Sequence, residues 1–268
     1  MFQITILFLY IIAGIALAAT RLPGLAGRTR FLLIVGVAFG ATGLVWHAML
    51  LWRSMTESGG LYLSIGNTAS VIGLQLALIA LLGSIESSLR GLAGGLLILG
   101  AAAAALTDFA PPPAAVTAMS WQIKAHILIS LFAYSLLSVG AIVAVYALIQ
   151  DRRLRSGRIS QVNQLFAPLE TTERLLFGIT TGGFLWLLLA VFSGFLFVDN
   201  LFAQHLAHKT ILSLLALFLF GLLFAGRQFA GWRGRRAVYL YLWGFLILCL
   251  AYFGSRYILE NILGRSWS

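Results

Sequence analysis

The sequence predicts an all-α membrane protein, a bundle of about eight transmembrane helices in a single polytopic domain over residues 1–268. Three observations support this fold class. Hydrophobic residues make up 60% of the chain and charged residues 10%, whereas a soluble domain carries about a quarter charged residues. Mean hydropathy is +0.97. Long apolar runs alternate with short connections that hold most of the arginines.

A transmembrane helix needs about 20 predominantly apolar residues. The fourth candidate segment, 91–107, is short and rich in Gly and Ala, which is typical of a helix packed against other helices. The first lacks the basic start of a secretory signal, so we interpret it as an uncleaved span. In chain order, the eight predicted spans are 2–20, 31–52, 62–84, 91–107, 122–149, 174–197, 210–227 and 237–258.

The basic residues predict the orientation of these spans, because cytoplasmic loops are enriched in Lys and Arg. With eight spans, this distribution places both termini on the outer, periplasmic side. Because the basic residues cluster in short loops, the net charge of +10 is explained by membrane orientation and does not indicate a nucleic-acid partner. One end of the bundle carries Arg21, Arg28, Arg30, Arg90, Arg152, Arg153, Arg155, Arg158, Arg174, Arg227, Arg233, Arg235 and Arg236, and the other carries Arg53, Lys124, Lys209, Arg256 and Arg265.

Several function classes find no support in the sequence. The single cysteine, Cys249, excludes an internal disulfide and a CxxC dithiol. There is no Walker A, GxSxG or HExxH motif, and no carboxylate lies in the middle of a span. We therefore expect neither an enzyme nor a proton-coupled pump, since a pump uses intramembrane acidic groups.

All four histidines fall at the predicted outer end: His47 in the second span, His126 in the fifth, and His205 and His208 beside the seventh. Imidazole is a common ligand of haem iron and transition metals. The alternatives are an interhelical hydrogen bond for His47 and His126, and a solvated pair for His205 and His208. No cysteine or ordered spacing indicates a structural zinc site.

The fifth span also carries a polar stripe, because His126, Ser130, Tyr134 and Ser138 recur every four residues and so lie near one helix face. Such a stripe forms either a hydrogen-bonded seam between helices or the wall of a ligand cleft. Two outer connections, 56–70 and 197–209, mix aromatic, apolar and polar residues. They suit the walls of a flat macrocycle or ordinary interfacial loops.

The second half of the chain resembles the cytochrome c assembly family, the haem-handling membrane proteins of the CcsA, CcmC and HemX type. The resemblance rests on H-x(7)-Y at 126–134, then S-G, K-T, GWRGRR at 231–236 and YFG at 252–254. It implies a haem site on the outer face, ligated by histidines that flank a tryptophan-rich loop. His126 matches the first of these histidines, and Lys209 matches the lysine at the end of that loop.

The resemblance also shows departures, because "VDNLFAQHLAHK" stands where the tryptophan-rich stretch is expected, and no histidine follows the last span. We infer that His208, His47 or His205 supplies the second axial ligand, and we name His126 and His208 as the iron ligands. Haem b is then expected near the outer ends of spans two, five and seven.

These expectations define a function: a haem-binding or haem-handling protein of the bacterial inner membrane. Its expected partners are the lipid bilayer and apocytochrome c or other assembly proteins. Ser130, Tyr134 and Lys209 are expected to contact the cofactor. The alternatives are a transporter or accessory subunit that keeps the fold without haem, and a structural scaffold whose histidines only form hydrogen bonds.

Overall fold

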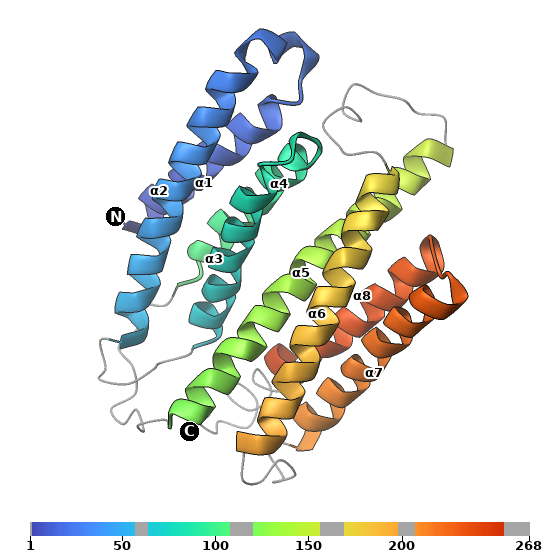
Figure 1. Cartoon of the computed structure of the whole chain (residues 1–268). Coiled ribbons are helices and arrows are strands. Elements are labelled where there is room, and N and C mark those ends of the chain that lie inside the picture. The colour runs from blue at the N-terminus through green and yellow to red at the C-terminus, as the bar shows by residue number, and fades with distance from the viewer. Residues whose placement is uncertain (1, 57–63, 108–119, 156–168, 198–206, 255–268) are drawn as a thin grey trace. The chain divides into compact units, whose positions relative to one another are not determined.

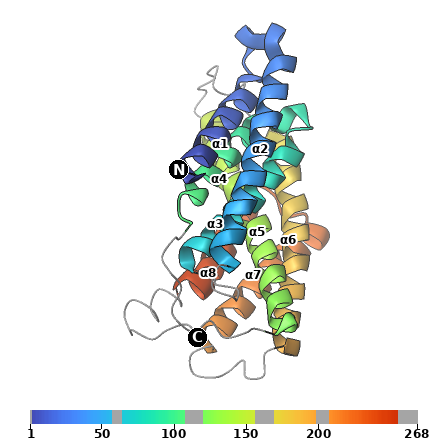
Figure 2. The ribbon, with the colours of Figure 1, turned by 90° about the vertical axis from the view of Figure 1, so that its left-hand side faces the viewer.

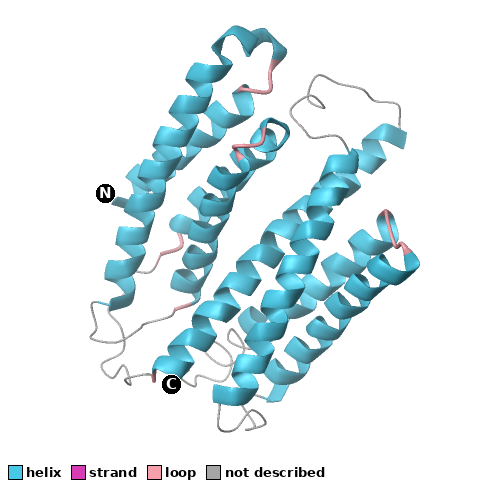
Figure 3. Cartoon of the chain, viewed as in Figure 1, coloured by secondary structure: helices cyan, strands magenta, loops and turns pink. Residues whose placement is uncertain are grey.

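The computed structural model describes residues 2–56, 64–107, 120–155, 169–197 and 207–254. Helices form all the regular structure within these ranges (Figure 3). Eight of them are long and apolar enough to cross a membrane, which confirms the predicted number of spans. The orientation of the termini stays a prediction.

The helices fall into two compact units. The first contains α1 (Phe2–Ala19), α2 (Thr29–Thr56), α3 (Ile65–Gly83) and α4 (Arg90–Ala104), with the 3₁₀ turns η1 (Pro23–Arg28) and η2 (Ser87–Leu89) between them. The second contains α5 (Trp121–Arg155) as far as Arg152, α6 (Leu169–Phe197), α7 (Ala207–Ala230), α8 (Arg235–Cys249) and the π-helical turn η4 (Leu250–Gly254).

In the first unit, α1 packs against α2 and α4, and α3 packs against α4 and α2. Figures 1 and 2 show α1 and α2 side by side in both views. Glycine makes the α1–α4 approach possible, because a Cβ added to Gly14 would lie 2.7 Å from the Gly94 carbonyl oxygen. The small residues of α4 are thus its packing face, as its composition predicted.

In the second unit, α7 packs against both α6 and α8, while two tyrosines join α5 to α8. The Tyr241 hydroxyl donates to the Leu137 carbonyl at 2.8 Å, and the Tyr134 hydroxyl donates to the Leu248 carbonyl at 2.6 Å. Both tyrosines are buried. In lipid such groups need protein partners, so the pair ties α5 to α8 at two levels.

The helix boundaries differ modestly from the predicted spans. α5 continues past residue 149 to Arg155, and α6 begins at Leu169 rather than 174, because charged and polar residues extend a helix readily beyond its apolar part. α3 begins at Ile65, where the Ser64 side chain caps the helix by accepting from the Asn67 N–H at 2.9 Å. The end of the predicted last span, 255–258, lies outside the described residues.

We expect Gly140→Ala to destabilise the second unit. A Cβ at this position would collide with the hydroxyl of Tyr241, whose side chain is fully buried, and overpacking of this kind costs about 1–3 kcal/mol. Thermal unfolding of the purified protein in detergent measures the loss. Gly178→Ala is the matched control, because a Cβ there meets open space; equal midpoints for the two variants would contradict the packing described.

The predicted orientation can be tested with single cysteines in a Cys249→Ala background. Trp121→Cys lies at the start of α5 and Ser87→Cys in η2 between α3 and α4. A membrane-impermeant maleimide applied to spheroplasts should label position 121 and should reach position 87 only after lysis. The reverse pattern would show that the charge rule assigns the wrong side.

Candidate functional site

His47 lies in a fully buried hydrogen-bond chain inside the first unit. Its Nδ1 is 3.2 Å from the Tyr10 hydroxyl, and its Nε2 is 2.8 Å from Ser70 Oγ. Ser70 Oγ is in turn 2.7 Å from Thr107 Oγ1, which donates to the Ala104 carbonyl at 2.8 Å. This hydrogen-bond chain therefore links α1, α2, α3 and the end of α4.

The Ala104 carbonyl fixes the direction of this chain, because a carbonyl oxygen can only accept. Thr107 donates its one proton there and so accepts from Ser70. Ser70 then accepts from Nε2–H of His47, which leaves Nδ1 as the acceptor for the Tyr10 hydroxyl. Both ring nitrogens of His47 are engaged, and the ring would have to release a hydrogen bond before it could bind a metal.

His126 occupies a different setting, in the second unit. It is half-buried on α5, and its Nδ1 lies 2.9 Å from Ser193 Oγ on α6. The neighbouring position is Gly194, where an added Cβ would lie 3.2 Å from the imidazole Cε1. The Ser-Gly pair thus gives the imidazole a hydrogen-bond partner and the space to lie against α6.

The protonation of His126 follows from the same reasoning. Ser193 Oγ donates to the Ala190 carbonyl at 2.9 Å, so its one proton is used and it accepts from His126. Nδ1 is therefore the N–H of the imidazole, and Nε2 carries the lone pair. A nitrogen in this state can bind iron.

Further along α5, Tyr134 joins a cluster with Tyr252 of η4 and Lys209 of α7. The two tyrosine rings are 5.9 Å apart in an edge-on arrangement, and the Lys209 Nζ lies 5.1 Å from the centre of the Tyr252 ring. Lys209 is also close enough to interact electrostatically with His126. The structure thus gathers three of the sequence-predicted residues, His126, Tyr134 and Lys209, into one unit.

The other predicted residues stand as follows. Ser130 is half-buried on α5, and His208 is exposed in the first turn of α7. Ser138 donates back to the Tyr134 carbonyl of its own helix at 2.7 Å, so it does not extend the seam to another helix through this bond. His205 lies outside the described residues. Within those residues, no group of three or more His, Cys, Asp or Glu side chains could hold a metal ion.

An aromatic pair lies about one helical turn outward from His126. Trp121 of α5 and Phe197 of α6 have ring centres 6.2 Å apart. Phe197 follows Ser193 by four residues and so lies on the same face of α6. Trp121 is 71% exposed. Sequence analysis did not select this pair, because neither residue stands out until α5 and α6 are known to be neighbours.

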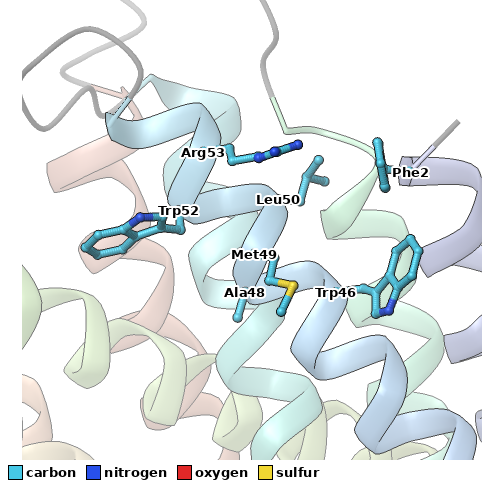
Figure 4. A pocket seen from close by; sticks show the side chains of 7 residues that line it. All are labelled: Phe2, Trp46, Ala48, Met49, Leu50, Trp52 and Arg53. Atoms are coloured by element: carbon cyan, nitrogen blue, oxygen red, sulfur yellow. The ribbon is translucent and has the colours of Figure 1, made fainter.

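The first unit carries an open apolar hollow of about 680 Å³ at the end of α2 (Figure 4). Phe2 and Trp46 pack against each other at one side of it, with ring centres 5.5 Å apart, and Trp52 extends in another direction. Among the described residues that line it, Arg53 is the one that carries a charge. His47 is buried within the bundle and does not line it, so this hollow is separate from the histidine chain.

Most of this chain matches a known protein family. Residues 35–263 match the model of the cytochrome C assembly protein family. The chain belongs to that family. The matched region contains His47, His126, Ser193, Lys209 and Tyr252, so family membership covers residues of both units.

Curated relatives of this cytochrome c assembly family member include the inner membrane protein YpjD of Escherichia coli K12. It is 31% identical over 252 residues, which cover 91% of this chain and 94% of the relative. YpjD of Escherichia coli O157:H7 shows the same values. An Azospirillum brasilense protein described as an uncharacterized 28.8 kDa protein is 30% identical over 144 residues, 53% of each chain. No solved structure matches. The predicted family and the inner-membrane location are thus confirmed.

The buried chain around His47 makes a testable contribution to stability. We expect His47→Ala to lower the free energy of unfolding by about 1–3 kcal/mol, because it leaves Ser70 and Tyr10 buried without their partner. Tyr10→Phe should cost less, since it removes only the donor at one end. Thermal unfolding in detergent measures both. The control is Thr42→Ala on the exposed face of α2, and a His47→Ala midpoint equal to that of the control would contradict the assigned network.

Proposed function

We propose that this protein binds haem b at the outer end of its second unit, where His126 Nε2 would hold the iron, and presents the haem during cytochrome c assembly. The bound haem would supply the iron and the vinyl groups for attachment to apocytochrome thiols. The chain's own role is to bind and orient the haem, so we propose a non-catalytic function.

The single observation that carries this proposal is the Nδ1–H···Ser193 hydrogen bond of His126, at 2.9 Å. Histidines that bind metals almost always donate their other ring N–H to a fixed acceptor, which sets the tautomer and the ring orientation. Ser193 is itself anchored to the Ala190 carbonyl. Nε2 therefore carries a lone pair on a ring that two helices hold in place.

The surroundings of His126 also fit a haem. Its large apolar ring needs aromatic and aliphatic walls with a few polar contacts, and the Trp121–Phe197 pair stands one turn away at the exposed end of the same two helices. Lys209 provides a cation for a propionate. Its contact with the Tyr252 ring places its ammonium on the same side of the unit as Tyr134.

As the second residue that would hold the iron we retain His208, which is exposed in the first turn of α7, one residue before Lys209. His47 is the weaker choice, because both of its nitrogens already form hydrogen bonds in the first unit. The proposal for His208 rests on its exposure and on its neighbour Lys209.

The test is the absorption spectrum of the full-length protein purified from cells that make excess haem. We expect a Soret band that His126→Ala abolishes or shifts. Ser193→Ala should weaken haem affinity about 10–100-fold, because the orienting partner of the ligand is lost. His208→Ala should change the reduced spectrum while some haem is retained.

His47→Ala is the matched control, since it removes a histidine from the first unit and should leave the Soret band unchanged. A protein without a Soret band, or a band unaffected by His126→Ala, would overturn the proposal. The first result would favour a family member that keeps the fold without haem.

A further inference from the structure

The turn between α7 and α8 has a defined conformation at the end of the second unit opposite the predicted haem site. Its sequence, GWRGRR at 231–236, contains two glycines with positive φ, 62° at Gly231 and 67° at Gly234. Only glycine adopts this backbone region at little cost. The two glycines therefore let the chain reverse direction within four residues.

Contacts from both sides hold this turn in place. The Trp232 N–H donates to the Gly226 carbonyl at 3.0 Å, and its indole packs where a side chain at residue 226 would collide. Arg227 donates to the Trp232 carbonyl at 3.2 Å, and its guanidinium lies 3.9 Å from the centre of the Phe177 ring. Arg227 thus stabilises the turn itself, and the conformation of the turn does not depend on a bound ligand.

The remaining arginines of the turn divide into two kinds. Arg235 is paired with Asp151 of α5 at 2.7 Å. Arg233 and Arg236 are exposed and form no ion pair with the residues that the structure describes. Among the acids of α6, Glu173 interacts electrostatically with Arg227, and Glu170 is paired with Arg174 at 3.2 Å. Two arginines on a rigid turn are therefore available to an external anion.

An apolar side chain lies close to these charges in the sequence. Phe229, in the last turn of α7, is 90% exposed, the highest value among the large hydrophobic side chains that the structure describes. At the end of a membrane helix, such a ring is suited to the boundary between headgroups and acyl chains. The first turn of α8 carries no acidic residue and its N-cap forms no side-chain hydrogen bond, so the helix dipole also favours an anion here.

We infer that the α7–α8 turn binds the headgroup phosphate of an anionic phospholipid in the cytoplasmic leaflet, through Arg233 and Arg236, with Phe229 against the acyl chains. Guanidinium groups pair with phosphate oxygens in a bidentate way, and the predicted orientation places this turn on the side where anionic headgroups attract arginine. This inference is independent of haem binding.

Native mass spectrometry of the delipidated full-length protein tests it, with phosphatidylglycerol and phosphatidylcholine as the lipids. We expect tighter binding of phosphatidylglycerol, and Arg233→Gln/Arg236→Gln should weaken it roughly tenfold or more, at about fivefold for each arginine near the surface. Arg28→Gln/Arg30→Gln is the matched control, because it removes two exposed arginines from the first unit at the same predicted side. That control should keep the tight site.

Two further arms identify the ligand. Phe229→Ala should weaken phosphatidylglycerol binding, and inorganic phosphate at millimolar concentration should not displace the lipid. Displacement by phosphate, with no effect of Phe229→Ala, would show a free-phosphate site instead and overturn the lipid assignment. Equal binding of the two lipids, or equal losses in both double variants, would also overturn it. Circular dichroism of each purified variant checks that its helices are intact.

Discussion

A carbonyl oxygen accepts hydrogen bonds but never donates one. Inside a membrane no water is present to serve as an alternative hydrogen-bond partner. Ala104 in the first unit and Ala190 in the second each receive a side-chain hydroxyl proton. From these two carbonyls the direction of every further bond in each network follows. The two histidines in these networks consequently hold opposite tautomers, with the proton on Nε2 in His47 and on Nδ1 in His126. One ring closes a structural network, and the other keeps a lone pair directed away from its anchor.

This difference separates two interpretations that the sequence left open. An imidazole has two ring nitrogens, so one can form an interhelical hydrogen bond while the other binds haem iron. For a membrane histidine these two roles are therefore not alternatives unless both nitrogens are already engaged. His47 uses both nitrogens within the bundle, so it ties helices together. His126 uses one for Ser193, so the same bond that joins α5 to α6 also orients the ring. Packing and ligand binding are thus compatible at His126.

The eight spans were predictable because apolar length and charge placement act locally along the chain. His126 and Lys209 were found through motifs, and the structure places both in the second unit. Ser193, Trp121 and Tyr252 were not selected, because each gains a role only from a neighbour far away in sequence. Tyr10 and Thr107 were missed for the same reason: 97 residues separate two groups that one hydrogen-bond chain connects. Periodicity reveals which face of a helix is polar, but it does not reveal which helix that face meets.

The π-helical turn at Leu250–Gly254 has a further consequence for comparisons within the family. Its hydrogen bonds enclose one residue more than those of an α-helix, and each α-helical residue turns the helix by about 100°. The residues of η4 therefore follow a different angular register from those of α8. A relative whose last helix lacks this turn would face the site with a different residue unless its sequence were shorter by one position. Alignments of this segment should accordingly allow a single-residue gap between Tyr241 of α8 and Tyr252 of η4.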